Sequence, residues 1–343
     1  MTAMRQCRFA ILLTGLLLML PVFLRADAPQ SALHPAGPAA AEISHLARFV
    51  LILFLIVAAV MWILILLVLT RPRGSFDEHA PIHFERGYSW IWIGGFAVPI
   101  VILATVFVSG LRANSHFPIH DGPAHPADIR ITGHQWWWDI EYLSGGVNQY
   151  FRTANEIHIP AGRPVDIELD SVDVIHSFWV PALHGKVDLV PGQVNHIRIE
   201  ADQPGTYSGQ CAEYCGAQHA NMKLLVIADR PEEFERWEEN QRQDSRQAVD
   251  EQQRAGQDLF LSRPCGLCHT IRGTLANGRV GPDLTHIGSR QKIAANMLPN
   301  DDANLAAWIT HAQALKPASE MPDITQFDGR QLQAMVAYLR QLQ

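Results

Sequence analysis

The sequence predicts a multi-domain protein with a two-helix transmembrane hairpin, then an all-β domain of Greek-key type, then a small all-α domain. Three observations support this fold class. Two long uncharged runs lie before Leu111 and are long enough to cross a membrane. Short segments that alternate apolar and polar residues follow, with turn residues between them. From Ala255 onward the apolar residues recur at helical spacing.

Composition excludes several classes of protein. The chain has 343 residues, of which 48% are hydrophobic, and its formal net charge is −7. A negative balance without a Lys/Arg stripe argues against a nucleic-acid partner. Aromatic residues make up 8% of the chain, which argues against wholesale disorder. At this length two or more domains are expected.

Residues 1–28 have the layout of a secretory signal peptide. Arg5 and Arg8 precede the apolar stretch Phe9–Leu20, and small residues follow, which is the order of such a leader. The alternative is a first transmembrane helix, although the apolar stretch is short for a span. Cleavage would remove Cys7 with the leader.

Residues 42–112 are predicted to form the two-span hairpin. The first run, Phe49–Leu69, is 21 residues without a charge and would extend about 31 Å as a helix, which is the thickness of a hydrocarbon core. The second run, Tyr88–Leu111, is also uncharged. Three arginines lie between the runs and two on the outer flanks, so the charge distribution favours a cytoplasmic loop only weakly.

The remainder of the chain divides into three parts that differ in composition and in the spacing of apolar residues. Residues 125–230 carry the short alternating segments and are predicted to form the β domain. Residues 231–254 are charged and glutamine-rich, and we interpret them as a solvated linker, with a helix conceivable in its first half. Residues 255–343 are predicted to be mainly α, with an amphipathic last helix over Asp328–Leu342.

The first cysteine cluster predicts a metal centre. Cys211, Cys215, His219 and Met222 occupy one loop, and His176 lies upstream. Thiolate, imidazole and thioether form a soft donor set that selects copper. Two thiolates four residues apart can bridge two copper ions, so the site is interpreted as binuclear. The alternatives are a disulfide between the two cysteines and a tetrahedral zinc site.

Four motifs in this part of the chain resemble a known family. They are Gly133-His-Gln-Trp-Trp-Trp138, Val174-Ile-His-Ser-Phe178, Gly185-Lys-Val-Asp188 with Pro191-Gly192, and the Cys211–Met222 loop. Residues from about His45 to Ala228 are similar to subunit II of haem-copper cytochrome oxidases, which have two membrane spans followed by a cupredoxin domain with a dinuclear copper centre. The family often has a Glu shortly before the second span, but Glu78 and Glu85 are shifted in spacing and receive no role.

The resemblance implies roles for seven positions. Cys211 and Cys215 would bridge two copper ions, while His176 and His219 would each bind one. The remaining implied ligands are Met222 on one ion and the main-chain carbonyl of Glu213 on the other. The Glu213 side chain would reach a magnesium or manganese ion shared with the catalytic subunit, unless it is only a solvated glutamate. Trp136 matches the tryptophan at which electrons enter, unless it belongs to the core.

The second cluster has the C-x-x-C-H pattern of covalent haem attachment. Cys265 and Cys268 would bond to the haem, and His269 would bind the iron. A redox or zinc pair can imitate part of this pattern. With Gly281-Pro282 and Met321-Pro322 downstream, the domain resembles class I cytochromes c. The resemblance implies Met321 as the second axial ligand, with Met297 as its rival, and a hydrogen bond from His269 to the Pro282 carbonyl.

Together these resemblances imply a caa-type oxidase subunit II with a fused cytochrome c. Electrons would pass from a donor cytochrome c or bc-type complex through one haem c and two copper ions. They would reach a catalytic subunit I, associated with subunit III, which reduces oxygen to water and pumps protons. The chain would be a multi-pass protein in the lipid of the bacterial inner membrane, with both redox domains in the periplasm. The oxygen-reducing site would lie outside this chain.

Two other functions stay open on the sequence alone. One is the equivalent subunit of a nitric oxide reductase, and the other is a membrane-tethered copper and haem electron carrier or copper-binding protein. A quinol oxidase subunit is disfavoured, because such subunits lack the copper ligands. Residues 125–230 hold 13 acidic and 7 basic residues, a surface that could steer a cationic donor.

Overall fold

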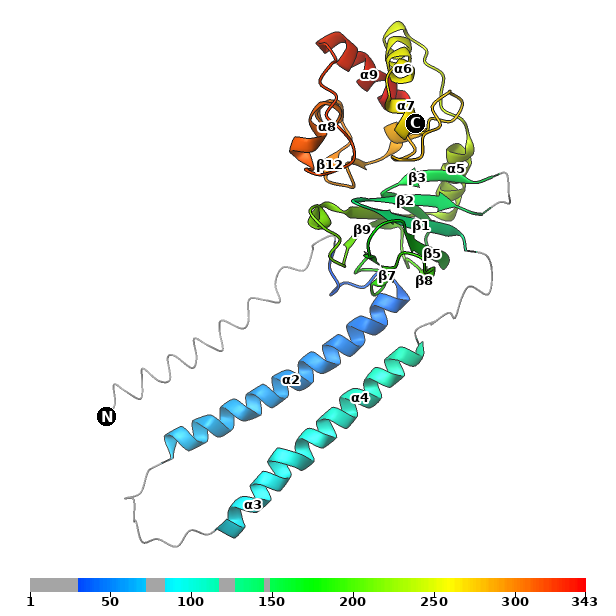
Figure 1. The fold of residues 1–343 in the computed structure, drawn as a ribbon. Helices are drawn as coiled ribbons and strands as arrows, with labels where there is room; N and C mark the ends of the chain where they lie inside the picture. The colour runs from blue at the N-terminus through cyan, green and yellow to red at the C-terminus, as the bar shows by residue number, and fades with distance from the viewer. Residues whose placement is uncertain (1–29, 72–83, 117–126, 145–148) are drawn as a thin grey trace. The chain divides into compact units, whose positions relative to one another are not determined.

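A computed structural model describes residues 30–71, 84–116, 127–144 and 149–343 (Figure 1). The leader predicted at residues 1–28 lies outside the described residues, as does Glu78. The chain divides into two compact units, one covering Ala41–Ile119 and the other Met1–Ala40 with His120–Gln343.

The first unit consists of apolar helices. They are α2 (Pro38–Thr70), α3 (Phe84–Trp92), the π-helical turn η2 (Ile93–Ala97) and α4 (Val98–His116). Pro38–Thr70 and Gly87–Ser115 are each long and apolar enough to cross a membrane. The first helix therefore extends beyond the run predicted from Phe49 to Leu69.

The π turn coincides with the glycine pair of the second apolar helix. Gly94 and Gly95 lie inside η2, and the amide of Val98 donates to the carbonyl of Ile93 five residues earlier. Pro99 follows directly and has no amide hydrogen to donate to the preceding turn. A local widening of this kind is a usual way for a helix to accommodate such residues.

The β domain is a sandwich of two five-stranded sheets, which confirms the predicted all-β domain (Figure 1). Its sheet orders are β3-β2-β1-β5-β8 and β4-β10-β9-β6-β7, with parallel pairs β1/β5 and β4/β10. The strands are β1 (Ile129–His134), β2 (Trp137–Tyr142), β3 (Phe151–Ala154), β4 (Glu156–Pro160), β5 (Val165–Ser171), β6 (His176–Trp179), β7 (Val187–Leu189), β8 (Asn195–Ile199), β9 (Gly205–Cys211) and β10 (Lys223–Asp229).

Strand β5 shows why the alternating pattern forms this sandwich. Val165, Ile167 and Leu169 are buried, and the acidic residues between them are half-buried. Asp166 pairs across the strands with Arg198, whose Nε lies 2.7 Å from a carboxylate oxygen. Each fully buried aliphatic side chain of this kind contributes about 1.5–3 kcal/mol.

Much of the segment interpreted as a solvated linker is a helix packed on the sandwich. Helix α5 covers Pro231–Arg242 and begins with Pro and two glutamates, which favour a helix start. Phe234 is buried, and Trp237 packs against the core and stacks on His158 with ring centroids 4.1 Å apart. Residues 243–250 hold neither helix nor strand.

The C-terminal domain is mainly α, as predicted, and contains four helices. They are α6 (Glu251–Ser262), α7 (Cys265–Cys268), α8 (Asp302–Leu315) and α9 (Gly329–Gln341). Two short pieces accompany them, the 3₁₀ turn η4 (Ile287–Ser289) and the hairpin of β11 (Lys292–Ile293) with β12 (Leu298–Pro299). Helix α9 begins at a capping box formed by Asp328 and Gln331.

Helices α6 and α9 lie close together (Figure 1), and Gly256 of α6 is at their contact. A Cβ atom added at Gly256 would lie 2.0 Å from the carbonyl oxygen of Ala334, so no larger residue fits there. Phe260 and Tyr338 fill the core beside this contact, with ring centroids 6.1 Å apart. Close contact between the two helices thus adds to the hydrophobic core of this small domain.

Candidate copper and haem sites

The first candidate site lies at the ends of two paired strands. Phe178 of β6 pairs with Cys211 at the end of β9, which places His176 and Cys211 next to each other. The loop from Cys211 to β10 contains the 3₁₀ turn η3 (His219–Asn221). The amide of Cys211 donates to the carbonyl of Met222, at 2.9 Å, and so closes the loop on itself.

The structure brings together all six residues implied as copper ligands. Around Cys211 Sγ, the nearest candidate donors are the Glu213 carbonyl at 3.2 Å, Cys215 Sγ at 3.7 Å and His176 Nδ1 at 3.9 Å. Around Cys215 Sγ, they are His219 Nδ1 at 3.6 Å and Met222 Sδ at 3.9 Å.

This donor set suits copper better than the two alternatives. Cys211 and Cys215 are free thiols in the structure, not a disulfide. The ligand atoms of His176 and both cysteines lie within 4.8 Å of one another and are buried. A thioether sulfur in the same cluster favours copper over zinc, because zinc sites use nitrogen, thiolate and carboxylate donors.

Two neighbours hold the imidazole of His176 in place. Its Nε2 lies 2.8 Å from Asp173 Oδ1, which leaves Nδ1 directed at the cysteines. On the other side, a Cβ atom at Gly133 would lie 2.7 Å from Cδ2 of the ring, so only glycine leaves room for it. A carboxylate partner of this kind orients a metal-binding histidine and increases its basicity.

The two thiols titrate as one coupled pair. The hydrogen bond with Cys215 lowers the pKa of Cys211, and a hydrogen bond with His176 lowers it further. Burial raises this pKa, but by less. The neighbouring Cys211 thiolate raises the pKa of Cys215, and burial adds to this effect. A bound cation would relieve the repulsion between the two thiolates.

The Glu213 side chain forms an ion pair with Lys186. Its carboxylate is partly exposed and lies 3.3 Å from the ammonium of Lys186. Among the described residues, no group of three potential metal donors includes this carboxylate.

The three consecutive tryptophans occupy three different environments. Trp136 lies in the turn between β1 and β2, is 8% exposed, and donates from Nε1 to the carbonyl of Cys215 at 2.9 Å. Trp137 stacks on His134, with ring centroids 4.4 Å apart. Trp138 is fully buried and packs edge-on against Phe178. Trp136 precedes strand β2, so only Trp137 and Trp138 follow the alternation of faces along that strand.

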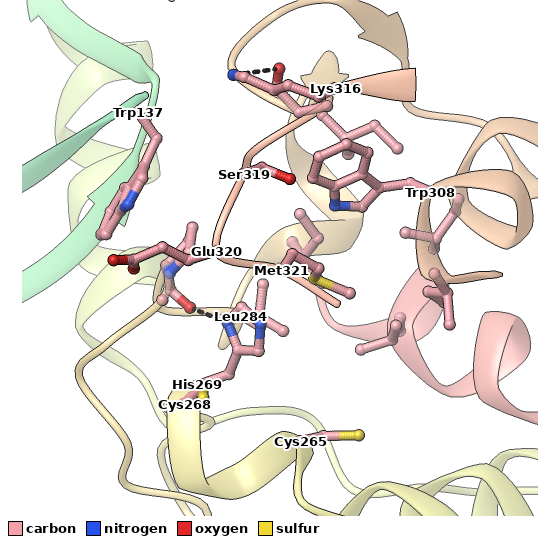
Figure 2. Close-up of a pocket in the computed structure, with 18 of the residues that line it drawn as sticks. Trp137, Cys265, Cys268, His269, Leu284, Trp308, Lys316, Ser319, Glu320 and Met321 are labelled. Atoms are coloured by element: carbon pink, nitrogen blue, oxygen red, sulfur yellow. Dashed lines mark hydrogen bonds between the residues drawn. The ribbon is translucent and has the colours of Figure 1, made fainter. Parts of the chain in front are cut away.

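The second candidate site is a cavity of about 260 Å³ in the C-terminal domain, bordered by the turn of Trp136 and Trp137. Cys265 and Cys268 lie at the two ends of the short helix α7, and the ring of His269 is directed toward the loop that carries Met321 (Figure 2). All four of these residues line the cavity. Its walls are otherwise largely apolar, as a haem pocket requires.

The geometry around His269 fits a metal ligand. Its Nδ1 lies 2.8 Å from the carbonyl oxygen of Pro282, so Nε2 is left for an iron ion. Burial lowers the pKa of His269, although the hydrogen bond to the Pro282 carbonyl acts in the opposite direction. The lowered pKa favours the neutral form that binds metals. A Cβ atom at Gly281 would lie 2.6 Å from the ring, so the glycine is required for this placement.

The structure separates the two methionines that the sequence left as rivals. Met321 lines the cavity, and Met297 is not among the described residues that do. Met335 of α9 also lines the cavity but is fully buried in the helical core. Met321 is therefore the methionine best placed opposite His269.

Three further residues at these sites were not predicted from the sequence. Asp173 could have been suspected, since it lies three positions before His176. Arg290 is buried, lines the cavity and donates to the carbonyl of Asp283, and its burial lowers its pKa. Lys316 is buried where the two domains meet, and no local pattern marks it.

Comparison with known proteins agrees with the two domains that follow the apolar helices. The family described as cytochrome c oxidase subunit II, periplasmic domain, matches residues 141–229, and the family described as cytochrome c matches residues 253–343. The cytochrome c oxidase subunit 2 of Alkalihalophilus pseudofirmus is 34% identical, with 91% of this chain and 90% of that protein covered. That of Bacillus subtilis is 25% identical, with 85% of each covered.

A solved structure is also similar to part of the chain. It is the periplasmic domain of subunit II of the cytochrome oxidase of Bradyrhizobium japonicum, 30% identical, with a TM-score of 0.32. The match covers 35% of this chain and 95% of that structure.

Proposed function

This chain belongs to the family of cytochrome c oxidase subunit 2, and from that premise we propose how its residues carry electrons into the oxidase. Relatives over most of the chain bear that name, and both domain families match. The chain is thus an oxidase subunit through which electrons enter, with a haem c domain and a copper domain. It associates with other oxidase subunits and is membrane-anchored with periplasmic domains. The nitric oxide reductase and copper carrier alternatives are not favoured.

The copper ligands are proposed from the donor geometry. Two copper ions would be held by the thiolates of Cys211 and Cys215. The remaining ligands would be His176, His219, Met222 and the main-chain carbonyl of Glu213. Five sulfur, nitrogen or oxygen contacts of 3.2–3.9 Å between these residues support this proposal. When bound, such a centre and a haem supply reversible one-electron oxidation.

The haem ligands are proposed in the same way. Cys265 and Cys268 would form the two covalent bonds, with His269 and Met321 on the iron. The hydrogen bond of His269 to Pro282 and the position of Met321 on the cavity wall support this assignment.

One observation joins the two sites. Trp136 lines the cavity of the C-terminal domain and donates its indole hydrogen bond to the carbonyl of Cys215. Because Trp136 is 8% exposed, a soluble donor would have little access to it. We therefore propose that the donor, a cytochrome c or a bc-type complex, delivers electrons to the C-terminal domain, and that Trp136 conducts them to the copper site.

Finer features of the assembly complete the proposal. The partners would be catalytic subunit I, where oxygen is reduced and protons are pumped, and subunit III, in a bacterial inner membrane. The Glu213 carboxylate would bind magnesium or manganese at the contact with subunit I, and would exchange its pairing with Lys186 for the ion. The proposed limits are leader 1–28, hairpin 42–112 and cupredoxin domain 125–230. Because α5 packs on the sandwich and α6 begins at Glu251, the proposed linker shortens from 231–254 to 243–250, and the cytochrome c domain predicted at 255–343 begins with α6.

Metal analysis of the purified chain tests the central proposal. We expect two copper ions and one haem per chain, with the paramagnetic-resonance spectrum of a mixed-valence copper pair and the absorption spectrum of a Met/His haem. A single copper, or zinc in its place, would overturn the binuclear assignment. Met321→Ala should abolish the Met/His spectrum, and an unchanged spectrum would shift the assignment to Met297 or Met335.

A further inference from the structure

Lys316 is a buried lysine whose side chain contacts three separate segments of the β domain and the C-terminal domain. It follows helix α8, is 3% exposed, and its Nζ donates to three main-chain carbonyls. These are the carbonyl of Trp136 at 2.7 Å, that of Asn221 at 3.0 Å and that of Ala294 at 3.4 Å. The first belongs to the turn beside the copper loop, the second to the copper loop itself, and the third to the C-terminal domain.

The surroundings of this ammonium are unusual for a lysine. No ion pair among the described residues includes Lys316, although lysines are rarely buried without a charged partner. Burial lowers the pKa of Lys316 to about 7, and the Cys215 thiol acts in the opposite direction. Its hydrogen bonds to the three carbonyls are therefore its main compensation for desolvation.

Two neighbouring hydrogen bonds also cross the boundary between the β domain and the C-terminal domain. Gln218 Nε2 donates to the carbonyl of Pro317 at 2.9 Å, and the Lys223 amide donates to the carbonyl of Ala295 at 3.3 Å. Five residues beyond Lys316, Met321 lines the cavity on the same loop (Figure 2). The segment from Lys316 to Met321 thus contacts the copper loop at one end and carries the proposed iron ligand at the other.

We propose that Lys316 is a positioning residue that holds the C-terminal cavity against Trp136 and the copper loop, and thereby sets the rate of electron transfer between the two centres. The inference rests on the function proposed above. Removing the ammonium leaves three carbonyls without this donor at a buried boundary. The boundary would then loosen, and small displacements of reacting groups have large effects on rate.

The test uses the assembled oxidase loaded with copper and haem. An electron is delivered photochemically to the haem, and reduction of the copper centre is followed by absorbance. Lys316→Met should slow this step by about tenfold or more, and Lys316→Arg, which keeps the charge and several donors, should recover part of the rate. Arg330→Met is the control, because it removes one exposed charge from the same domain.

A second measurement does not depend on activity. The Lys223 amide crosses the boundary to Ala295, so its hydrogen exchange in the full chain should accelerate in Lys316→Met and not in Arg330→Met. Direct reduction of copper by a small reductant should stay at the wild-type rate. A wild-type transfer rate and unchanged exchange in Lys316→Met would overturn the proposal.

The outcomes separate this inference from the proposed function. If the unmodified chain itself lacks the copper-pair or haem spectrum, the proposed function fails. If both spectra persist in Lys316→Met and only the transfer slows, the positioning role is supported. Should Lys316→Met not assemble, Gln218→Leu removes the contact to Pro317 and should slow transfer in the same direction. Unslowed transfer in Gln218→Leu would then reject the positioning role.

Discussion

The indole of Trp136 donates a hydrogen bond to the main-chain carbonyl of Cys215 at 2.9 Å. The same carbonyl accepts a second hydrogen bond from Gln135 Nε2 at 2.7 Å. A residue beside the haem cavity is thereby connected to a residue of the copper loop through one hydrogen bond. The contact makes Trp136 the natural place to test the electron route.

Trp136→Phe should slow electron transfer from haem to copper by about tenfold, because a smaller aromatic ring replaces the indole and the hydrogen bond to the Cys215 carbonyl is lost. Stability should fall only modestly, by about 0.5–1.5 kcal/mol, since Gln135 still satisfies the carbonyl. Photochemical transfer kinetics measure the first effect and thermal unfolding the second. Trp237→Phe, on helix α5, is the matched control, because it also loses an indole. Equal rates of haem-to-copper transfer in the two variants would show that Trp136 does not conduct the electrons.

Asp173→Asn should weaken copper binding by about 10–100-fold, which is the usual effect of losing the partner of a metal-binding histidine. The side chain keeps its size, but the charge that orients His176 is gone. Competition titration with a copper chelator gives the affinity. Asp202→Asn, an exposed aspartate of the same domain, should bind copper as the unmodified chain does. Equal affinities in both variants would show that Asp173 does not support the ligand.

Gly281→Ala should impair haem ligation, because the new methyl group would lie 2.6 Å from the His269 ring. Overpacking of this kind costs about 1–3 kcal/mol, and the ring would have to move away from Pro282. Absorption spectra of the reduced protein should show partial loss of the Met/His form. Gly329→Ala is the control, since no atom lies within 4 Å of the position that its new methyl group would take. Intact spectra in Gly281→Ala would contradict the expected ring placement.

Stability of the β domain should decrease as the pH rises above neutrality, in part because of His158. Burial lowers the pKa of His158, but the hydrogen bonds to Asp229 and Glu156 outweigh it, so the pKa lies above its ordinary value of 6.5. The stabilisation is therefore fully present below about pH 6.5 and is lost as the pH rises through the raised value.

His158→Gln should flatten this dependence, measured as the unfolding midpoint of the copper domain between about pH 6 and pH 8. His311→Gln, at an exposed position of the C-terminal domain, should leave it unchanged. A slope in His158→Gln as steep as that of the unmodified chain would assign the effect to other groups.

The sequence predicts those parts of the sites whose residues are neighbours along the chain. Cys211, Cys215, His219 and Met222 fall within one loop, and Cys265, Cys268 and His269 within one helix and its end. Their spacing therefore reports their chemistry directly. The strands were also predictable, because burial on one face imposes the alternation seen in β5.

Features that depend on distant contacts could not be predicted in this way. Lys316 bonds to carbonyls at positions 136, 221 and 294, and main-chain carbonyls have no signature in the sequence. Helix α5 looked solvated because two aromatic residues among many charges form too weak a pattern. Only the fold shows that Phe234 and Trp237 meet the sandwich.

The short segment 243–250 between α5 and α6 ties the cytochrome domain to the copper domain within one chain. A tether of this length turns a collision between two proteins into a first-order event with a fixed local concentration. Transfer between the centres should then be independent of dilution, and dissolved salt should have little access to the buried contact of Lys316. Ionic strength and the supply of donor would affect only the transfer of electrons from the donor to the C-terminal domain. The transfer from haem to copper, which takes place within one chain, would depend on neither.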